Sequence, residues 1–90
     1  MSRYQMVCEA HGLTIEQGKT LRKMVLLTTF MHGLFGKEKE AELRSMGLLI
    51  DTKAGRMDSC AKLSRTGNEI AQELMTAEID DEIDDMAASD

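Results

Sequence analysis

The chain has 90 residues, a length that suits one small domain with a limited core. It contains no Pro or Trp, one Tyr and two Phe, so the core must be mainly aliphatic, and eight Met residues make that core adaptable. The lack of Pro and the abundance of Ala, Leu, Glu, Lys and Met favour a mainly helical protein. The longest apolar run, Met24–Leu27, is too short to cross a bilayer, which excludes the membrane-spanning class.

The net charge of −5 hides an uneven distribution of charge along the chain. Residues 1–67 hold all eleven Lys and Arg together with seven acidic residues, whereas residues 68–90 hold nine acidic residues and no basic one. The chain is therefore a mildly basic body followed by a strongly acidic end. Such an asymmetry bears on partners and solubility rather than on the fold.

The first predicted element is a short helix over Arg3–His11, with Tyr4, Val7 and Cys8 on one face and Gly12 after its last residue. An alternating apolar pattern in the same residues also fits a short strand, which remains the alternative.

The second predicted helix covers Thr14–His32. Thr14 is followed three residues later by Gln17, which is the capping-box arrangement at a helix start. Gly33 is a typical C-terminal stop, whereas Gly18 costs about 1 kcal/mol relative to Ala inside a helix, so the helix alternatively begins just after it. Apolar residues at helical spacing form a wide stripe that predicts a largely buried helix: Leu21, Met24, Val25, Leu27, Phe30 and Met31.

The third predicted helix covers residues 37–46, between two glycines. Leu43 and Met46 are expected to face the core, and Glu40 is expected to pair with Arg44 one turn later. The hydrophobic period then changes to that of a hairpin, with the strand-like run LLI, the turn-like sequence DTKAG and the extended segment RMDSCAKLS. The side of that extended segment expected to face the core carries Met57, Ala61 and Leu63.

The last predicted helix begins at either Ser64 or Thr66, since Thr66 and Glu69 have the spacing of a second capping box. Its apolar stripe consists of Ile70, Ala71, Leu74 and Met75. Beyond Ala77 the sequence EIDDEIDDMAASD keeps apolar residues at helical spacing, so the helix can continue. Six acidic residues within 78–85 repel one another, however, and are expected to fray it unless a cationic partner is near. The predicted division is therefore a domain over 1–77 and an acidic tail or helix extension over 78–90.

Two glycine-containing phrases flank the predicted hairpin. The first consists of Leu43, Gly47, Leu48 and Leu49. The second consists of Leu63, Ser64 and Gly67. Residues 42–74, which contain both phrases, resemble the second half of winged helix-turn-helix domains of the MarR type. In that family a recognition helix ends in Leu-x-x-x-Gly-Leu-[Ile/Val], a hairpin wing follows, and Leu-[Thr/Ser]-x-x-Gly opens the next helix.

The resemblance implies a recognition helix over Lys37–Met46 and a wing tip over Lys53–Arg56. It also implies a short helix before the recognition helix, for which the candidate is Thr14–His32, although the spacing from this helix to the wing is shorter than in the family. The hypothesised DNA-binding residues are Lys53, Arg56, Lys62, Arg65, Lys37 and Arg44.

The charges of the implied recognition helix fit DNA poorly. Base edges are read by Arg, Lys, Asn, Gln, Ser and Thr, whereas this helix carries Glu38, Glu40 and Glu42. Carboxylates facing phosphates oppose binding, so a solvated helix face of mixed charge is the alternative interpretation. The basic residues of the hairpin either contact phosphates or keep the sheet edge soluble.

The acidic end has three interpretations. It is a solvating tail, a helix extension that pairs with a second copy, or a docking segment whose carboxylates meet a basic groove on a partner protein. In a further form of the third interpretation, the acidic end shields the basic body of its own chain and lowers its affinity for DNA. The hypothesised partner-binding residues are Ile79, Asp80, Asp81, Glu82, Ile83, Asp84 and Asp85. For pairing with a second copy, the apolar side chains would be Ile79, Ile83 and Met86.

Catalytic and metal-binding patterns are weak. Cys8 and His11 have ligand-like spacing, but His32 and Cys60 stand alone, and a structural zinc site usually shows two such pairs. No phosphate-binding glycine loop or nucleophile elbow occurs in the sequence. We therefore predict no metal, no cofactor and no enzymatic activity.

These patterns predict a mainly α, winged-helix-like domain with three to four helices and one β-hairpin. The leading hypothesis is a small, dimeric, DNA-binding transcriptional regulator. We expect it to be cytoplasmic, because the N-terminal sequence has no signal-peptide core. The alternative is a protein-binding module or inhibitor, of the size of phage modulators of host transcription or defence, whose acidic end engages a basic partner.

Overall fold

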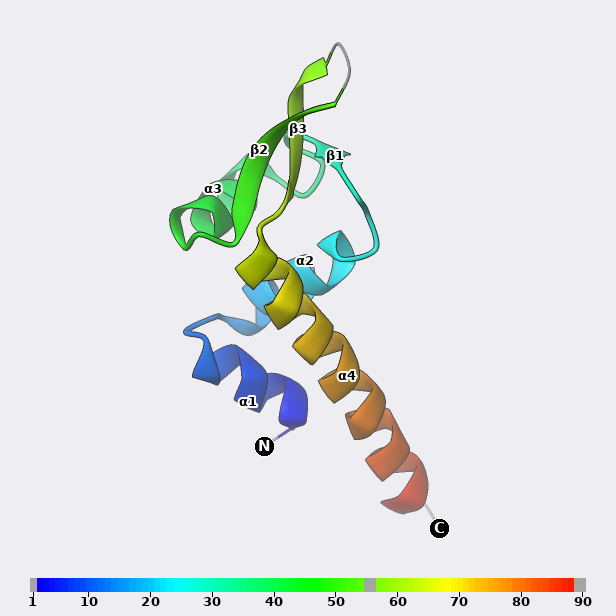
Figure 1. Cartoon of the computed structure of the whole chain (residues 1–90). Helices are drawn as coiled ribbons and strands as arrows, with labels where there is room; N and C mark the ends of the chain where they lie inside the picture. Colours follow the sequence, from blue (N-terminus) through cyan, green and yellow to red (C-terminus); the bar gives the residue numbers. More distant parts are fainter. Residues whose placement is uncertain (1, 55–56, 89–90) are drawn as a thin grey trace.

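Helix α4 (Arg65–Ala88) runs along the molecule and extends past the other helices towards the C-terminus (Figure 1). The computed structural model describes residues 2–54 and 57–88, with the backbone alone described for 53–54, 57–59, 84–85 and 87–88. The hairpin and the C-terminal end of α4 lie at opposite ends of the long axis (Figure 1). The other elements are α1 (Arg3–Ala10), α2 (Ile15–Met24), β1 (Phe30–Met31), α3 (Lys37–Ser45), β2 (Leu49–Ala54) and β3 (Met57–Leu63).

Helices α1, α2 and α4 pack together around fully buried side chains, and α1 is the predicted helix rather than a strand. These side chains are Cys8, Leu21, Met24 and Leu74. Gly18 permits the close approach of α1 and α2, because a Cβ at this position would lie 2.5 Å from Cys8 Sγ. This packing of α1 against α2 therefore compensates for the low helix propensity of Gly18. Tyr4 lies at the same contact, where burial raises the pKa of its hydroxyl to about 12, with smaller increases from Cys8 and Glu78.

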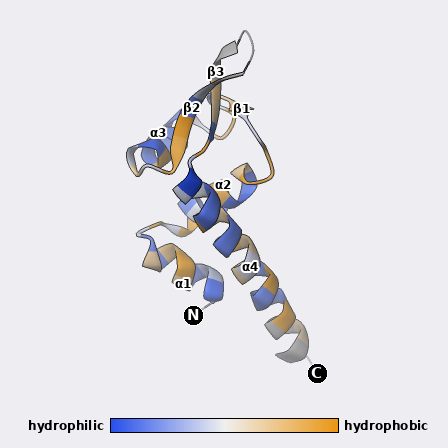
Figure 2. Cartoon of the chain, viewed as in Figure 1, coloured by the Kyte–Doolittle hydropathy of each residue, from blue (hydrophilic) through white to orange (hydrophobic). Residues whose placement is uncertain are grey.

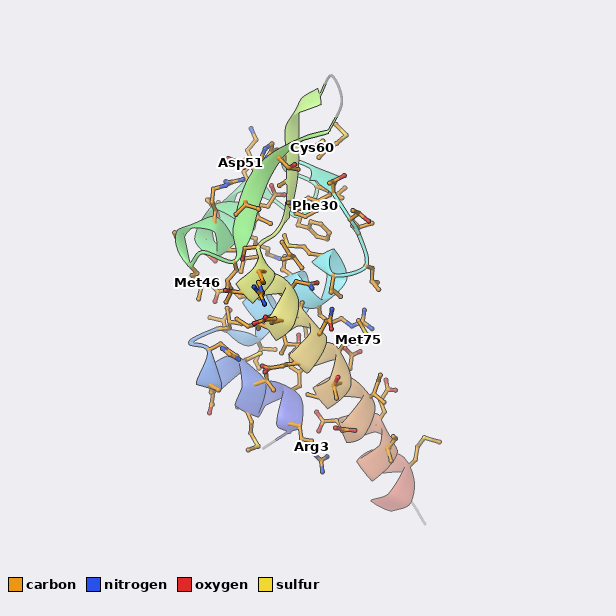
Figure 3. All side chains as sticks on the ribbon, viewed as in Figure 1. Arg3, Phe30, Met46, Asp51, Cys60 and Met75 are labelled. Carbon is orange, nitrogen blue, oxygen red and sulfur yellow. The ribbon has the colours of Figure 1, made fainter. Side chains whose placement is uncertain are left out.

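The predicted capping box at Thr14 and Gln17 is present, since each side chain accepts a hydrogen bond from the other residue's N–H. The predicted helix over Thr14–His32 is nevertheless too long, because α2 ends at Met24. Phe30 instead pairs with Ala61 of β3 as part of a short strand, and its ring packs edge-on against Phe35 with centroids 5.0 Å apart. Figure 3 shows Phe30 between the sheet and α2, and its side chain belongs to the buried core.

Helix α3 ends as predicted at Gly47, whose φ of +77° suits glycine. The N–H of Leu48 donates to the carbonyl of Leu43 and the N–H of Gly47 to that of Arg44, which forms a Schellman motif. Leu43 is fully buried, but Met46 is 38% exposed, so the prediction that Met46 faces the core is wrong. Met46 belongs to the C-terminal end of the helix and lies at the surface.

In the described residues the strands form an antiparallel sheet of order β1-β3-β2. Register places Leu49 and Leu63 opposite each other, and Ile50 opposite Lys62. Leu49 is buried on the inner face with Phe30 and Ala61, whereas Ile50 and Lys62 are exposed on the outer face. The predicted mainly α, winged-helix-like fold with a hairpin is confirmed, and β1 adds a strand that the sequence patterns did not predict.

The junction of the hairpin and α4 explains the two glycine phrases. Ser64 donates its N–H to the carbonyl of Leu48 and its hydroxyl to that of Gly47, and its Oγ accepts a hydrogen bond from the N–H of Gly67. The helix therefore starts after Ser64, and the predicted capping box at Thr66 is wrong. A Cβ on Gly67 would collide with the carbonyl oxygen of Leu48, so the first turn of α4 rests directly on backbone.

Helix α4 continues through Ala77 to Ala88, so residues 78–88 are helical in the structure. Of the predicted stripe of Ile70, Ala71, Leu74 and Met75, the first three residues are buried against the rest of the molecule and Met75 is half-buried. The proposed domain boundary after Ala77 stays a prediction. Within the described residues, none of the helices is both long and apolar enough to cross a membrane.

Candidate nucleic-acid interface

The structure divides the hypothesised DNA-binding residues into separate groups. Lys62 and Arg65 lie where β3 leads into α4, whereas Lys37 and Arg44 lie on α3, which packs against β2 on the inner face of the sheet. Arg56 lies outside the described residues. The side chain of Lys53 does as well, so the basic character predicted for the hairpin tip stays a prediction.

Lys62 and Arg65 border a hollow of about 380 Å³ between the hairpin and the segment that follows α2. Thr28 and Asn68 contribute polar groups to its wall, beside the apolar residues Val25 to Leu27 and Leu63. The N-terminus of α4 also opens here, because Arg65 is its first residue. Arg65 Nε lies 3.6 Å from Glu69 Oε1 in an exposed ion pair, and such surface pairs are weak. Lys62, Arg65 and the positive end of the helix dipole together therefore still favour an anion such as a phosphate.

The exposed surface of α3 is mixed in charge. Lys37 is exposed in the first turn, next to Glu38, and Glu42 is exposed one turn later. Glu40 is not part of that surface, since its side chain is 3% exposed and accepts hydrogen bonds from the N–H groups of Gly33 and Phe35. The predicted pairing of Glu40 with Arg44 is therefore wrong, because the carboxylate holds the turn before α3 instead.

That turn also bears on the resemblance to helix-turn-helix domains. The resemblance implied a short helix before the recognition helix, yet α2 ends at Met24 and residues 32–36 form turns between β1 and α3. Main-chain hydrogen bonds from Leu34 to Met31 and from Gly36 to Gly33 close these turns. In the described residues, α3 therefore follows β1 without an intervening helix.

Arg44 takes part in a charge cluster that links α3 to the hairpin. Its Nη2 lies 2.9 Å from Asp51 Oδ1 on β2 and 3.2 Å from His32 Nδ1. Figure 3 labels Asp51 on the hairpin. Arg44 is thus already neutralised by a carboxylate of its own chain, and Arg44 Nε is buried without a hydrogen-bond partner among the described residues.

Part of the acidic segment is used within the chain. Asp81 accepts hydrogen bonds from the N–H groups of Arg3 and Tyr4, so it caps α1 from α4. Glu78 pairs with Arg22 of α2 at 2.9 Å. These acidic side chains therefore contact α1 and α2, whereas Lys62 and Arg65 lie near the other end of α4. The described part of the acidic segment thus contacts basic residues of α1 and α2 and not those of the hairpin, and masking of the basic body stays a prediction.

The remaining candidate partner-binding residues mostly face solvent. Ile79 is 50% exposed and Ile83 is 57% exposed, on the side of α4 opposite Leu74. Asp80 and Glu82 flank them, and Figure 2 shows hydrophobic and hydrophilic residues interleaved along this half of the helix. The side chains of Asp84 and Asp85 lie outside the described residues.

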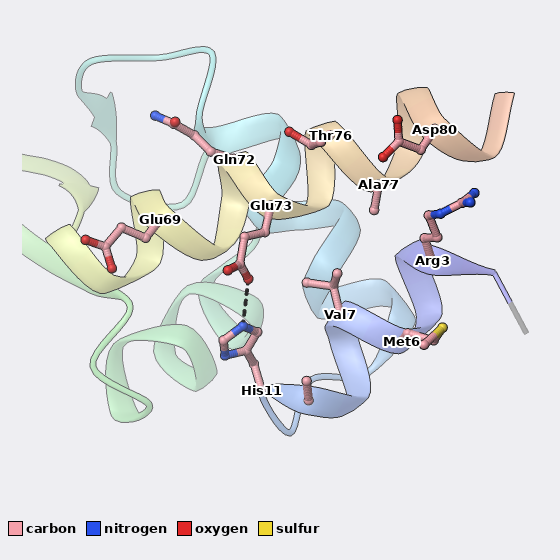
Figure 4. Close-up of a pocket in the computed structure, with 11 residues that line it drawn as sticks. Arg3, Met6, Val7, His11, Glu69, Gln72, Glu73, Thr76, Ala77 and Asp80 are labelled. Atoms are coloured by element: carbon pink, nitrogen blue, oxygen red, sulfur yellow. Dashed lines mark hydrogen bonds and ion pairs between the residues drawn. The ribbon is translucent and has the colours of Figure 1, made fainter. Parts of the chain in front are cut away.

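A groove of about 800 Å³ runs along the contact between α1 and α4, and Asp80 is among the residues that line it (Figure 4). Met6, Val7 and Ala77 line it, and the contact between His11 Nε2 and Glu73 Oε2, 2.9 Å apart, spans its two walls. His11 is thereby assigned to a helix–helix contact.

In the part of the chain that is described, no group of three or more His, Cys, Asp or Glu side chains is arranged to hold a metal ion. Cys8 and Cys60 are both buried free thiols.

The helices, the sheet order and the hairpin define a winged-helix-like domain. A solved structure with this fold is the multiple antibiotic-resistance repressor (MarR) from Listeria monocytogenes 4b F2365, which superimposes with a TM-score of 0.65 at 18% sequence identity. The aligned part covers 83% of this chain and 60% of that chain. At this identity the likeness shows the fold alone. No known family profile and no curated protein matches the sequence.

Sequence patterns missed the contacts between residues that are distant in the chain. Asp81 is separated from Arg3 by most of the chain, and Glu78 from Arg22 by more than half of it. The contacts of Asp51 and His32 with Arg44 also gave no local signal, because the three residues come from separate elements or turns of the chain. The sequence held one signal for these contacts. The last helix has an excess of acidic residues, and the first two helices carry basic residues that can pair with them.

Proposed function

We propose that this chain is a small, non-enzymatic DNA-binding regulator of winged-helix type, acting in the cytoplasm, and that the outer face of its hairpin carries the phosphate contacts. The observation that carries the proposal is the hollow bordered by Lys62 and Arg65 at the N-terminus of α4, within a winged-helix-like fold. A two-stranded ribbon fits the major groove, which places phosphates beside both of its faces. Helix α3, with Glu38 and Glu42 exposed, contributes less than the family resemblance implies.

We expect Lys62→Ala combined with Arg65→Ala to lower the steepness of the salt dependence of duplex binding by about 2 in a log–log plot, because each lost phosphate contact contributes about 0.9. Fluorescence anisotropy on a labelled duplex of random sequence measures this slope. The salt concentration is varied from about 50 to about 200 mM, because phosphate contacts change the affinity strongly in this range. The matched control is Lys19→Ala combined with Lys23→Ala, which removes the same charge from a different hollow. Equal slopes for both double variants would refute the assignment, and no binding by the native chain at low salt would refute the function.

We also propose that the chain forms a homodimer through α4, since Ile79 and Ile83 face away from the core of their own chain. Light scattering should give twice the mass of one chain for the native protein. Ile79→Ser combined with Ile83→Ser should give a monomer, whereas the control Leu26→Ser with Met31→Ser, at similarly exposed positions, should stay dimeric. A monomeric native protein at high concentration would contradict this proposal.

The second candidate function is a protein-binding module or inhibitor, of the kind found in phage modulators, that uses the acidic half of α4. It is favoured by Ile79 and Ile83, which are spaced one turn apart among carboxylates as anchors for a basic groove. Retention of a basic, nucleic-acid-binding protein by the native chain, with loss of retention for the Ile79→Ser and Ile83→Ser variant, supports this function. If both forms retain such proteins equally, the α4 surface is not responsible.

A further inference from the structure

The groove between α1 and α4 is open because small side chains meet along it. Ala10 of α1 and Thr76 and Ala77 of α4 line it, and their short side chains leave a volume of about 800 Å³. Figure 4 places Val7 and Ala77 between the two helices, and Met6 on the α1 side is 55% exposed. The groove therefore has an apolar floor that solvent reaches, and Met6 can adapt its shape to an apolar neighbour.

The α4 wall of this groove is acidic. Glu69, Glu73 and Asp80 all line the groove, and their helical spacing places them along one side of α4 over about 16 Å, or roughly three turns. The side chains of Glu69 and Glu73 are 66% and 57% exposed. Glu69 contacts Arg65 and Glu73 contacts His11, but a carboxylate has about four acceptor sites, so each can accept a further donor.

The α1 wall does not balance this charge. Among the described residues that line the groove, Arg3 is the one arginine or lysine. Its Nη1 lies 3.9 Å from Oδ1 of Asp81, a carboxylate outside the lining. The groove therefore carries three carboxylates of α4 and one guanidinium, which already has a carboxylate beside it. An occupant with positive charge next to its apolar surface complements such a groove.

We propose that the groove between α1 and α4 binds an amphipathic, basic helix of a partner protein. The apolar stripe of that helix packs on Met6, Val7 and Ala77, and its Lys or Arg side chains meet the acidic wall. Two adjacent helices offer the ridges and grooves into which a third helix packs, and the wall is long enough for about three turns. The α4 end of a second copy is disfavoured as the occupant, because carboxylates surround its Ile79 and Ile83. The inference does not depend on the proposed DNA-binding function.

The probe is a labelled synthetic helix of about 15 residues, with Leu on one face and Lys on both sides of that face. One matched peptide carries Glu in place of Lys, and another has the composition of the probe in scrambled order. In fluorescence anisotropy, the native chain should bind the probe at least about tenfold more tightly than either matched peptide, because only the probe combines the apolar stripe with the complementary charge.

Two variants test the floor and the wall of the groove separately. Ala10→Phe fills the groove without changing the charge and should weaken binding of the probe about tenfold. Glu69→Gln combined with Asp80→Asn removes two wall charges and should weaken it about fivefold. The control Glu9→Gln combined with Glu38→Gln removes the same charge from residues that do not line the groove, and should change the affinity by less than about twofold.

Methyl resonances of labelled Met residues locate the bound probe. The Met6 resonance should shift on binding, whereas that of Met46, exposed at the end of α3, should not. Ile79→Ser combined with Ile83→Ser should bind the probe as the native chain does, which separates the groove from the proposed dimer and from the second candidate function.

Three results overturn the proposal. The first is equal affinity of the native chain for the probe and the scrambled peptide. The second is unchanged binding by both the Ala10→Phe variant and the Glu69→Gln with Asp80→Asn variant, with circular dichroism checking that each is folded. The third is a native dimer that Ala10→Phe converts to a monomer in light scattering, since the occupant is then a second copy.

Discussion

Gly67→Ala is expected to lower the free energy of unfolding by about 3 kcal/mol, although alanine normally stabilises a helix by about 1 kcal/mol relative to glycine. The added Cβ would collide with the carbonyl oxygen of Leu48 and lie 2.9 Å from its carbonyl carbon. Backbone cannot rotate away as a flexible side chain can, so the hairpin and α4 must separate. Separation also strains the hydrogen bond from the Ser64 N–H to the same carbonyl.

Urea unfolding followed by circular dichroism measures this change. The matched control is Thr66→Ala, because Thr66 is exposed in the same turn of α4 and its substitution should leave stability unchanged or slightly raised. Since a small domain is stable by only about 5 to 15 kcal/mol, the loss in Gly67→Ala would be a large fraction of the total. A Gly67→Ala variant as stable as the native chain would show that α4 does not rest on the Leu48 backbone.

The second large effect is expected at Glu40, whose carboxylate accepts the N–H groups of Gly33 and Phe35 at 2.8 to 3.0 Å. Glu40→Ala should lower the free energy of unfolding by about 3 kcal/mol, because hydrogen bonds to a charged group are worth about 1.5 to 3 kcal/mol each and both donors lose their partner. The turn before α3 would also loosen, since Gly36 provides no side-chain cap for that helix.

Two further substitutions make the test at Glu40 specific. Glu40→Gln keeps one acceptor oxygen, which in the position of Oε2 still accepts both N–H groups. It loses the negative charge and the second contact of the Gly33 N–H with Oε1, so it should lose about half as much stability. Glu38→Ala removes an exposed carboxylate from the same helix and should change stability by less than about 0.5 kcal/mol. If Glu38→Ala and Glu40→Ala behave alike, the carboxylate does not hold the turn.

Local sequence signals located most elements of the fold. The capping box at Thr14 and the C-terminal glycines at Gly12 and Gly47 act within a few residues, so their pattern is readable without tertiary information. The hairpin was found from the change of period before β2. Phe30 was misassigned because its helical spacing from earlier apolar residues was genuine, yet α2 ends at Met24 and Phe30 is buried where it pairs with Ala61 on β3.

The candidate site was less predictable than the fold. Lys62 and Arg65 were named from their charge, but only the fold brings them to one hollow with Thr28. Arg44 was named as a DNA contact, whereas the structure pairs it with Asp51. An ion pair between distant residues leaves no spacing in the sequence, so its partner cannot be read from a local pattern.

The sequence by itself determined the helical composition, the hairpin, the glycine junctions and the division into a basic body and an acidic end. These features depend on residue type and on neighbours within one or two turns. Only the tertiary structure decided that Asp81 caps α1, that Glu40 is buried, and that the acidic half of α4 lies away from the hairpin. Each of those outcomes depends on where α4 and α3 pack, because an ionic side chain is satisfied by whichever partner the fold brings within reach.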